Sequence, residues 1–130
     1  MPARLELSEE NLRHLVTCFY ARIRQDAELG PIFNDAIGDW PEHLEKLTDF
    51  WSSVMLTTGR YKGRPVPAHL AHQARITPAL FQRWLALWTE TTNELMAPAA
   101  AQALQDKAAR IAESLQLALF FQLPGRQPAV

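Results

Sequence analysis

The stretch 8-SEENLRHLVTCFYARIRQD-26 has the pattern of an amphipathic helix and decides the fold class. Its apolar residues recur every three or four positions, which places them on one helical face. They are Leu12, Leu15, Val16, Phe19, Tyr20 and Ile23. Ser8 supplies the N-cap. An apolar helical face needs other helices to cover it, so we expect further amphipathic segments in the chain.

Three further helices are predicted from the same periodicity and from capping residues. Asp39 and Glu42 form a capping box, and Thr77 precedes a proline suited to a first helical turn. The predicted ranges are 39–58, 77–97 and 98–123. The linker 29-LGPIFNDAIGD-39 is interrupted by glycine and proline, so we expect a compact connection in which one short turn can form. With no alternating strand pattern, the fold class is all-α.

Size and charge bound the function. The 130 residues fit a single domain over 1–130, with a core at about 8–123 and a loose tail at 124–130. A formal charge of -1 does not indicate the basic surface that nucleic-acid binding needs. The chain shows neither a signal peptide nor an apolar run long enough to span a membrane, so we expect a cytoplasmic protein.

The connection 61-YKGRPVPAHLAHQ-73 is the most informative part of the chain outside the helices. It is long, and connections of this length without regular structure are usually functional or disordered. His69 and His72 resemble half of a zinc site, but zinc normally takes four ligands and no cysteine lies nearby. We therefore do not expect zinc there.

Three hydrogen-bonding side chains fall on the apolar stripes of three different helices: Tyr20, His43 and Trp84. Taken singly, each is more often a core residue than a ligand. Taken together, opposite a loop that carries histidines, they indicate a pocket whose contents need one metal ligand and several donors. Haem fits that description.

Four motifs occur in an order that resembles the truncated haemoglobins of group III: LVTCFYARIR.D..LGPIF, H.....DFW, Y.GRP...H and FQRWL.LW. The resemblance runs from about Leu12 to Leu119. It implies a shortened globin, in which two helix pairs cross in a two-over-two sandwich and a long irregular loop carries the proximal histidine. That histidine would be His69, the iron ligand, and His72 would be solvated or secondary.

The same resemblance assigns the remaining site residues. Tyr20, His43 and Trp84 would face the bound ligand. Lys46 would reach a haem propionate, as would Arg64 or Arg75. The residues expected to line the haem are Phe33, Leu47, Phe50, Trp51 and Val54. The extra proline and second histidine of the loop depart from the family pattern.

The expected function is that of a monomeric haem b protein that reversibly binds oxygen and other diatomic ligands, tightly because its pocket offers several donors. Detoxification of nitric oxide or peroxide, as a dioxygenase-like or peroxidase-like side activity with a reductase as partner, is a secondary hypothesis. The alternative is a haem-free helical module that uses the apolar groove for a partner or an apolar ligand.

Overall fold

The computed structural model describes residues 4–63 and 75–120. These residues form helices and irregular connections, and their only β-type pairing is an isolated bridge between Leu5 and Met96. The helices are α1 (Glu9–Gln25), α2 (Gly30–Ala36), α3 (Trp40–Leu56), α5 (Pro78–Leu95) and α6 (Pro98–Phe120). The prediction of an all-helical chain is confirmed for this part of the molecule.

The N-caps predicted from the sequence are present. The side chains of Ser8, Asp39 and Thr77 each accept a hydrogen bond from the backbone N–H three residues later, at 3.1, 3.1 and 3.3 Å. Each such cap stabilises a helix by about 1 kcal/mol. Local polar residues therefore fix where α1, α3 and α5 begin.

Two predicted helix ends were too late by two residues. α3 ends at Leu56 because Thr57 is left-handed, with φ 56°. α5 ends at Leu95 because Met96 is extended and the next residue, Ala97, donates its N–H to the carbonyl of Leu5 at 2.8 Å. The predicted end of the last helix, at residue 123, lies outside the described residues, as does the tail.

The linker prediction was wrong for Gly30–Ala36, which form helix α2. The Asp26 carboxylate turns the chain at this point by accepting hydrogen bonds from the N–H groups of Glu28 and Leu29, at 3.1 and 3.0 Å. Pro31 then occupies the first turn, where its missing N–H costs nothing. Gly30 packs against α1 so closely that a Cβ would lie 2.6 Å from a backbone carbonyl oxygen.

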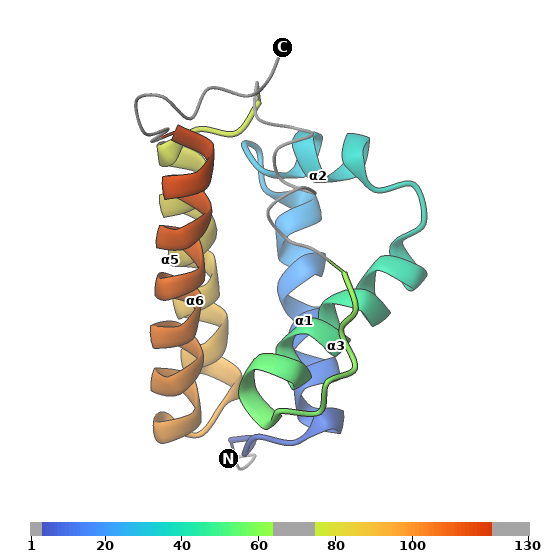
Figure 1. Ribbon diagram of the computed structural model, residues 1–130, viewed down its shortest axis with the longest axis vertical. Helices are drawn as coiled ribbons and strands as arrows, with labels where there is room; N and C mark the ends of the chain where they lie inside the picture. The colour runs from blue at the N-terminus through green and yellow to red at the C-terminus, as the bar shows by residue number, and fades with distance from the viewer. Residues whose placement is uncertain (1–3, 64–74, 121–130) are drawn as a thin grey trace.

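The helices pack in two pairs, α1 with α3 and α5 with α6 (Figure 1). α1 also contacts α5, so the two pairs meet along these helices. Arg83 of α5 bonds the Asp26 carboxylate at the end of α1, at 2.6 Å, which ties the pairs together at one edge. None of the described helices is long and apolar enough to cross a membrane.

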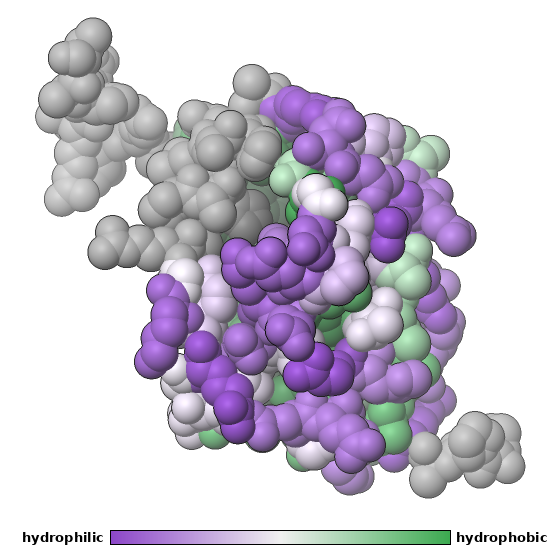
Figure 2. All heavy atoms as spheres, turned by 90° about the vertical axis from the view of Figure 1, so that its right-hand side faces the viewer, coloured by the Kyte–Doolittle hydropathy of each residue, from purple (hydrophilic) through white to green (hydrophobic). Residues whose placement is uncertain are grey.

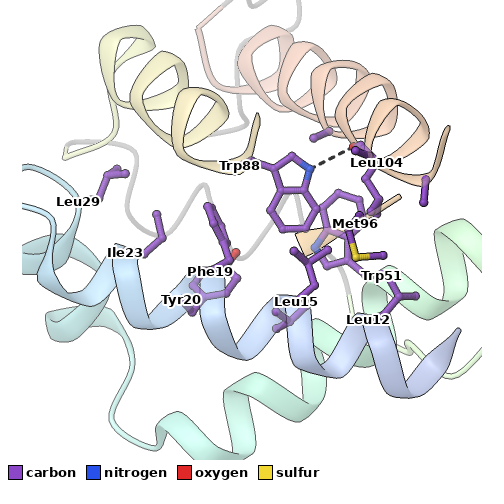
Figure 3. Close-up of a cluster of buried hydrophobic side chains, with 14 of the residues drawn as sticks. Leu12, Leu15, Phe19, Tyr20, Ile23, Leu29, Trp51, Trp88, Met96 and Leu104 are labelled. Atoms are coloured by element: carbon purple, nitrogen blue, oxygen red, sulfur yellow. Dashed lines mark hydrogen bonds between the residues drawn. The ribbon is translucent and has the colours of Figure 1, made fainter. Parts of the chain in front are cut away.

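The core lies between the pairs and centres on Trp88, which is fully buried and donates its indole N–H to the Leu104 carbonyl at 3.1 Å (Figure 3). Leu12, Leu15 and Phe19 of α1 pack into the same cluster and are also fully buried. On the outside, seen from the α2 and α3 side, hydrophobic residues are scattered among hydrophilic ones (Figure 2).

Candidate functional site

Tyr20 lies on α1 with 4% of its surface exposed. Its ring centroid is 5.8 Å from that of Phe33 on α2 and 4.9 Å from that of Phe19. Burial raises the pKa of the phenol above its usual value of 10, and a hydrogen-bonding interaction with the Trp84 side chain offsets part of that rise. Tyr20 therefore keeps its proton and can donate it to a hydrogen bond.

Trp84 is half-buried on α5 and is held by its neighbours. Its indole stacks on Trp88 with centroids 5.4 Å apart, and the Phe19 ring meets it edge-on at 5.2 Å. Phe19 thus contacts both Tyr20 and Trp84. The structure brings two of the three predicted ligand-facing residues together around one phenylalanine.

His43 is half-buried on α3. Burial lowers the pKa of its imidazole below the usual 6.5, the positive charge of Lys46 lowers it further, and Glu42 opposes both. A neutral imidazole carries one N–H donor and one acceptor nitrogen. At neutral pH, His43 can therefore either donate to or accept from a small molecule beside α3.

Trp40 belongs to this cluster, although the sequence analysis did not single it out. Its ring centroid is 6.1 Å from that of His43 and 6.2 Å from that of Tyr20, and the Arg24 guanidinium lies 4.7 Å from it. The signal was available in the sequence, because Trp40 and His43 are three positions apart and share a helix face. Trp40 therefore contacts two of the predicted ligand-facing residues, His43 and Tyr20.

The apolar residues predicted to line the haem divide into two groups. Phe33, Leu47, Phe50 and Val54 are half-buried and pack against the edge of the core. Trp51 instead is 2% exposed and stacks on Trp88 with centroids 4.5 Å apart (Figure 3). The half-buried group leaves apolar surface that a flat apolar ligand would cover.

The predicted cationic partners are spread around the molecule. Lys46 is exposed and pairs with Glu42 at 3.5 Å, one helical turn away. Arg75 pairs with Asp35 at the end of α2, at 2.9 Å. Arg64, His69 and His72 lie outside the described residues. No three His, Cys, Asp or Glu side chains gather as a metal site in residues 4–63 and 75–120.

The beginning of the Y-x-G motif is described, and its geometry explains the glycine. The Tyr61 N–H donates to the Ser53 hydroxyl at 2.9 Å, and its ring meets Phe50 edge-on at 5.2 Å. A Cβ at Gly63 would lie 2.5 Å from the Tyr61 hydroxyl oxygen, so a larger residue there would require the Tyr61 ring to shift. The chain therefore departs from α3 along a defined path.

A hollow of about 310 Å³ lies between α5 and α6. Its lining residues are Gln82, Leu85, Ala109, Ala112, Glu113, Gln116 and Leu117. None of them is a predicted site residue. The hollow is therefore separate from the cluster around Tyr20, to which α5 contributes Trp84.

Comparison with solved structures defines the class as a truncated globin. The chain superposes on the crystal structure of group III truncated haemoglobin from Campylobacter jejuni with a TM-score of 0.82 and 32% sequence identity, over 92% of this chain and 97% of that one. The predicted two-over-two helical sandwich is confirmed by this similarity.

The sequence comparison gives the particular branch. No family model matches the chain. A curated relative, the group 3 truncated haemoglobin ctb of Campylobacter jejuni, is 33% identical over 118 residues, which span 88% of this chain and 92% of the relative. The chain belongs to the group III truncated haemoglobins.

Proposed function

We propose that this protein binds haem b and, through it, reversibly binds oxygen and other diatomic ligands. The observation that carries the proposal is that the buried Tyr20 phenol and the Trp84 indole pack against the same ring, that of Phe19, in a chain that belongs to a haemoglobin family. Such donors can hydrogen-bond a polarised diatomic ligand.

The described residues fit a haem group in their chemistry. Half-buried apolar side chains of α2 and α3 offer surface for the porphyrin, including Phe33, Leu47 and Val54. His69 is proposed as the iron ligand from the family motif, and Lys46, Arg64 and Arg75 as partners of the propionates. When bound, the iron supplies the coordination position for a diatomic ligand.

The role of the protein side chains is to hold that ligand. Tyr20 donates through its O–H, Trp84 through its indole N–H, and neutral His43 through one ring nitrogen. Each well-aligned bond contributes about 1–1.5 kcal/mol, so two of them slow release by very roughly 30- to 150-fold. Tight retention suits a protein that polarises a bound ligand, so we propose nitric oxide or peroxide detoxification as its use, with a reductase to return electrons.

The test of the proposed function is the visible spectrum of the purified protein in its ferric, ferrous and carbon-monoxide-bound forms. We expect a haem Soret band that shifts on reduction and again with carbon monoxide. His69→Ala should lose the band or its ligand-dependent shifts, whereas the matched control His72→Ala should keep both. A colourless protein that free haemin cannot reconstitute would support the haem-free alternative instead.

A further inference from the structure

Three of the four tryptophans of the chain form one stack. The Trp88 indole is the shared member: it stacks on Trp51 with centroids 4.5 Å apart and planes 20° apart, and on Trp84 at 5.4 Å and 12°. Indole is the most easily oxidised of the apolar side chains, and electron tunnelling falls off steeply with distance. Stacked indoles therefore pass single electrons readily.

The two ends of the stack lie in different surroundings. At one end, Trp84 and the Tyr20 of the proposed ligand site both contact the ring of Phe19, with centroids 5.2 and 4.9 Å away. At the other end, the edge of Phe50 meets Trp51 with centroids 5.5 Å apart, and Tyr61 meets Phe50 at 5.2 Å. Tyr61 is partly exposed. A continuous series of aromatic contacts thus runs from the site, through the core, to the solvent.

The surroundings of Trp88, the middle ring of the stack, favour transfer of the positive charge that oxidation leaves on it over retention of that charge. Trp88 is fully buried, and its N–H donates to the backbone carbonyl of Leu104, which is not a base that could take the proton. The faces of neighbouring rings stabilise a cation, but a buried charge still costs desolvation. An electron vacancy therefore moves on towards Tyr61, whose phenol can release its proton to water.

From this geometry we propose that Trp84, Trp88 and Trp51 form an electron relay between Tyr61 and the ligand site, through which the protein reduces hydroperoxides at the expense of a phenolic reductant in solution. The inference rests on the proposed function, because the site needs its haem to engage the peroxide. It adds the substrate class, the reductant class and the route.

The chemistry balances over two single-electron steps. The hydroperoxide takes up two electrons and two protons, its O–O bond breaks, and it leaves as an alcohol and water, or as two waters when hydrogen peroxide is the substrate. Each electron leaves Trp84 and is replaced from Trp88, Trp51 and finally Tyr61. Tyr61 loses a proton to water as it loses its electron, and a phenol returns both as a hydrogen atom. Two phenols thus become two phenoxyl radicals.

The test begins with freeze-quenched electron paramagnetic resonance of the haem-loaded protein mixed with hydrogen peroxide. The protein is produced with and without ring-deuterated tryptophan. We expect an early organic radical whose signal narrows on deuteration. Trp88→Phe should prolong the radical at Trp84 and slow the oxidation of a phenol such as guaiacol by about tenfold, which corresponds to a barrier higher by about 1.4 kcal/mol.

Phe81→Leu is the control variant, because Phe81 is an aromatic residue of a separate core cluster and its ring meets that of Phe120. It should leave the tryptophan radical and the phenol oxidation unchanged. Uniform replacement of tryptophan by 5-fluorotryptophan keeps the shape and the N–H donor but makes the ring harder to oxidise. It should slow phenol oxidation even if Trp88→Phe folds poorly.

The outcomes separate the two proposals. A protein without a haem spectrum overturns both the proposed function and the relay. A normal haem spectrum overturns the relay alone if no deuterium-sensitive radical forms, or if Trp88→Phe oxidises guaiacol at the rate of the unmodified protein.

Discussion

Replacement of Tyr20 by phenylalanine tests how the site holds its ligand. The ring stays in contact with Phe19 and Phe33, whose centroids lie 4.9 and 5.8 Å away, so the change removes little besides the hydroxyl group. The phenol is buried, so water would not compete with the hydrogen bond that we propose between it and a bound ligand. Losing one such bond costs about 1–2 kcal/mol, which speeds oxygen release by about five- to thirtyfold.

The structure also says where in that range the result should fall. The Trp84 indole, which like Tyr20 contacts Phe19, offers a second N–H donor at the proposed site. In the variant, that N–H replaces part of the lost bond. We therefore expect the lower half of the range, at about five- to tenfold.

Stopped-flow displacement of oxygen by carbon monoxide measures the rate. Tyr61→Phe, the other tyrosine, is the matched control and should release oxygen within about twofold of the unmodified protein. An unchanged or slower release from Tyr20→Phe would refute the assignment of Tyr20 as a donor to the ligand.

Three further predictions concern pH and packing. The Arg83 guanidinium lowers the pKa of Asp26 below its usual 3.8, so the stability that this pair contributes is present above pH 3.8 and is lost as pH falls through the lowered folded value. Asp26→Asn should accordingly reduce the free energy of unfolding by about 1–2 kcal/mol in urea at neutral pH, with the difference vanishing in acid. Gly30→Ala should lower the free energy of unfolding by about 1–3 kcal/mol in the same assay, because its Cβ would lie 2.6 Å from a backbone carbonyl oxygen. Gly38→Ala is the control: a Cβ there has nothing within 4 Å, so this variant should raise the free energy of unfolding by about 0.4–1 kcal/mol. Equal losses in the two variants would contradict the close approach at Gly30. Because burial lowers the pKa of His43, any pH dependence of oxygen release that it causes should have its midpoint below pH 6.5 and disappear in His43→Leu; a midpoint above that value would show that the imidazole is not buried as described.

Local chemistry explains what could be predicted of the fold. Ser8, Asp39 and Thr77 fix helix starts through bonds to residues three positions away, so their effect is visible in a short window of sequence. Helix α2 was missed because its start depends on the Asp26 side chain turning the chain and on the contact of Gly30 with α1. In sequence alone, Gly30-Pro31 predicts an interruption of regular structure. In the folded chain this pair begins helix α2.

The sequence predicts which residues of the site share a helix face, but not which of them contact a ligand. The apolar stripe of α3 placed His43, Leu47 and Trp51 together, but periodicity does not tell which part of a stripe faces the core and which faces a ligand. In the structure Trp51 stacks on Trp88, far along the chain, while Leu47 stays at the edge of the core. The roles of His43, Lys46 and the other assigned residues remain predictions, and His69 carries the most weight among them.

The pairing of Leu5 with the turn between α5 and α6 affects how the protein can be handled. The Leu5 N–H donates to the Leu95 carbonyl at 2.9 Å, and the Leu5 carbonyl accepts a hydrogen bond from the Ala97 N–H at 2.8 Å. Beneath this pairing Met96 is fully buried. Removing the residues before α1 would expose the Met96 side chain and leave the Leu95 carbonyl and the Ala97 N–H without their partner. An affinity tag should therefore be added ahead of Arg4 and should not replace Leu5. Proteolytic cleavage after Leu7 would weaken the turn between α5 and α6 in the same way.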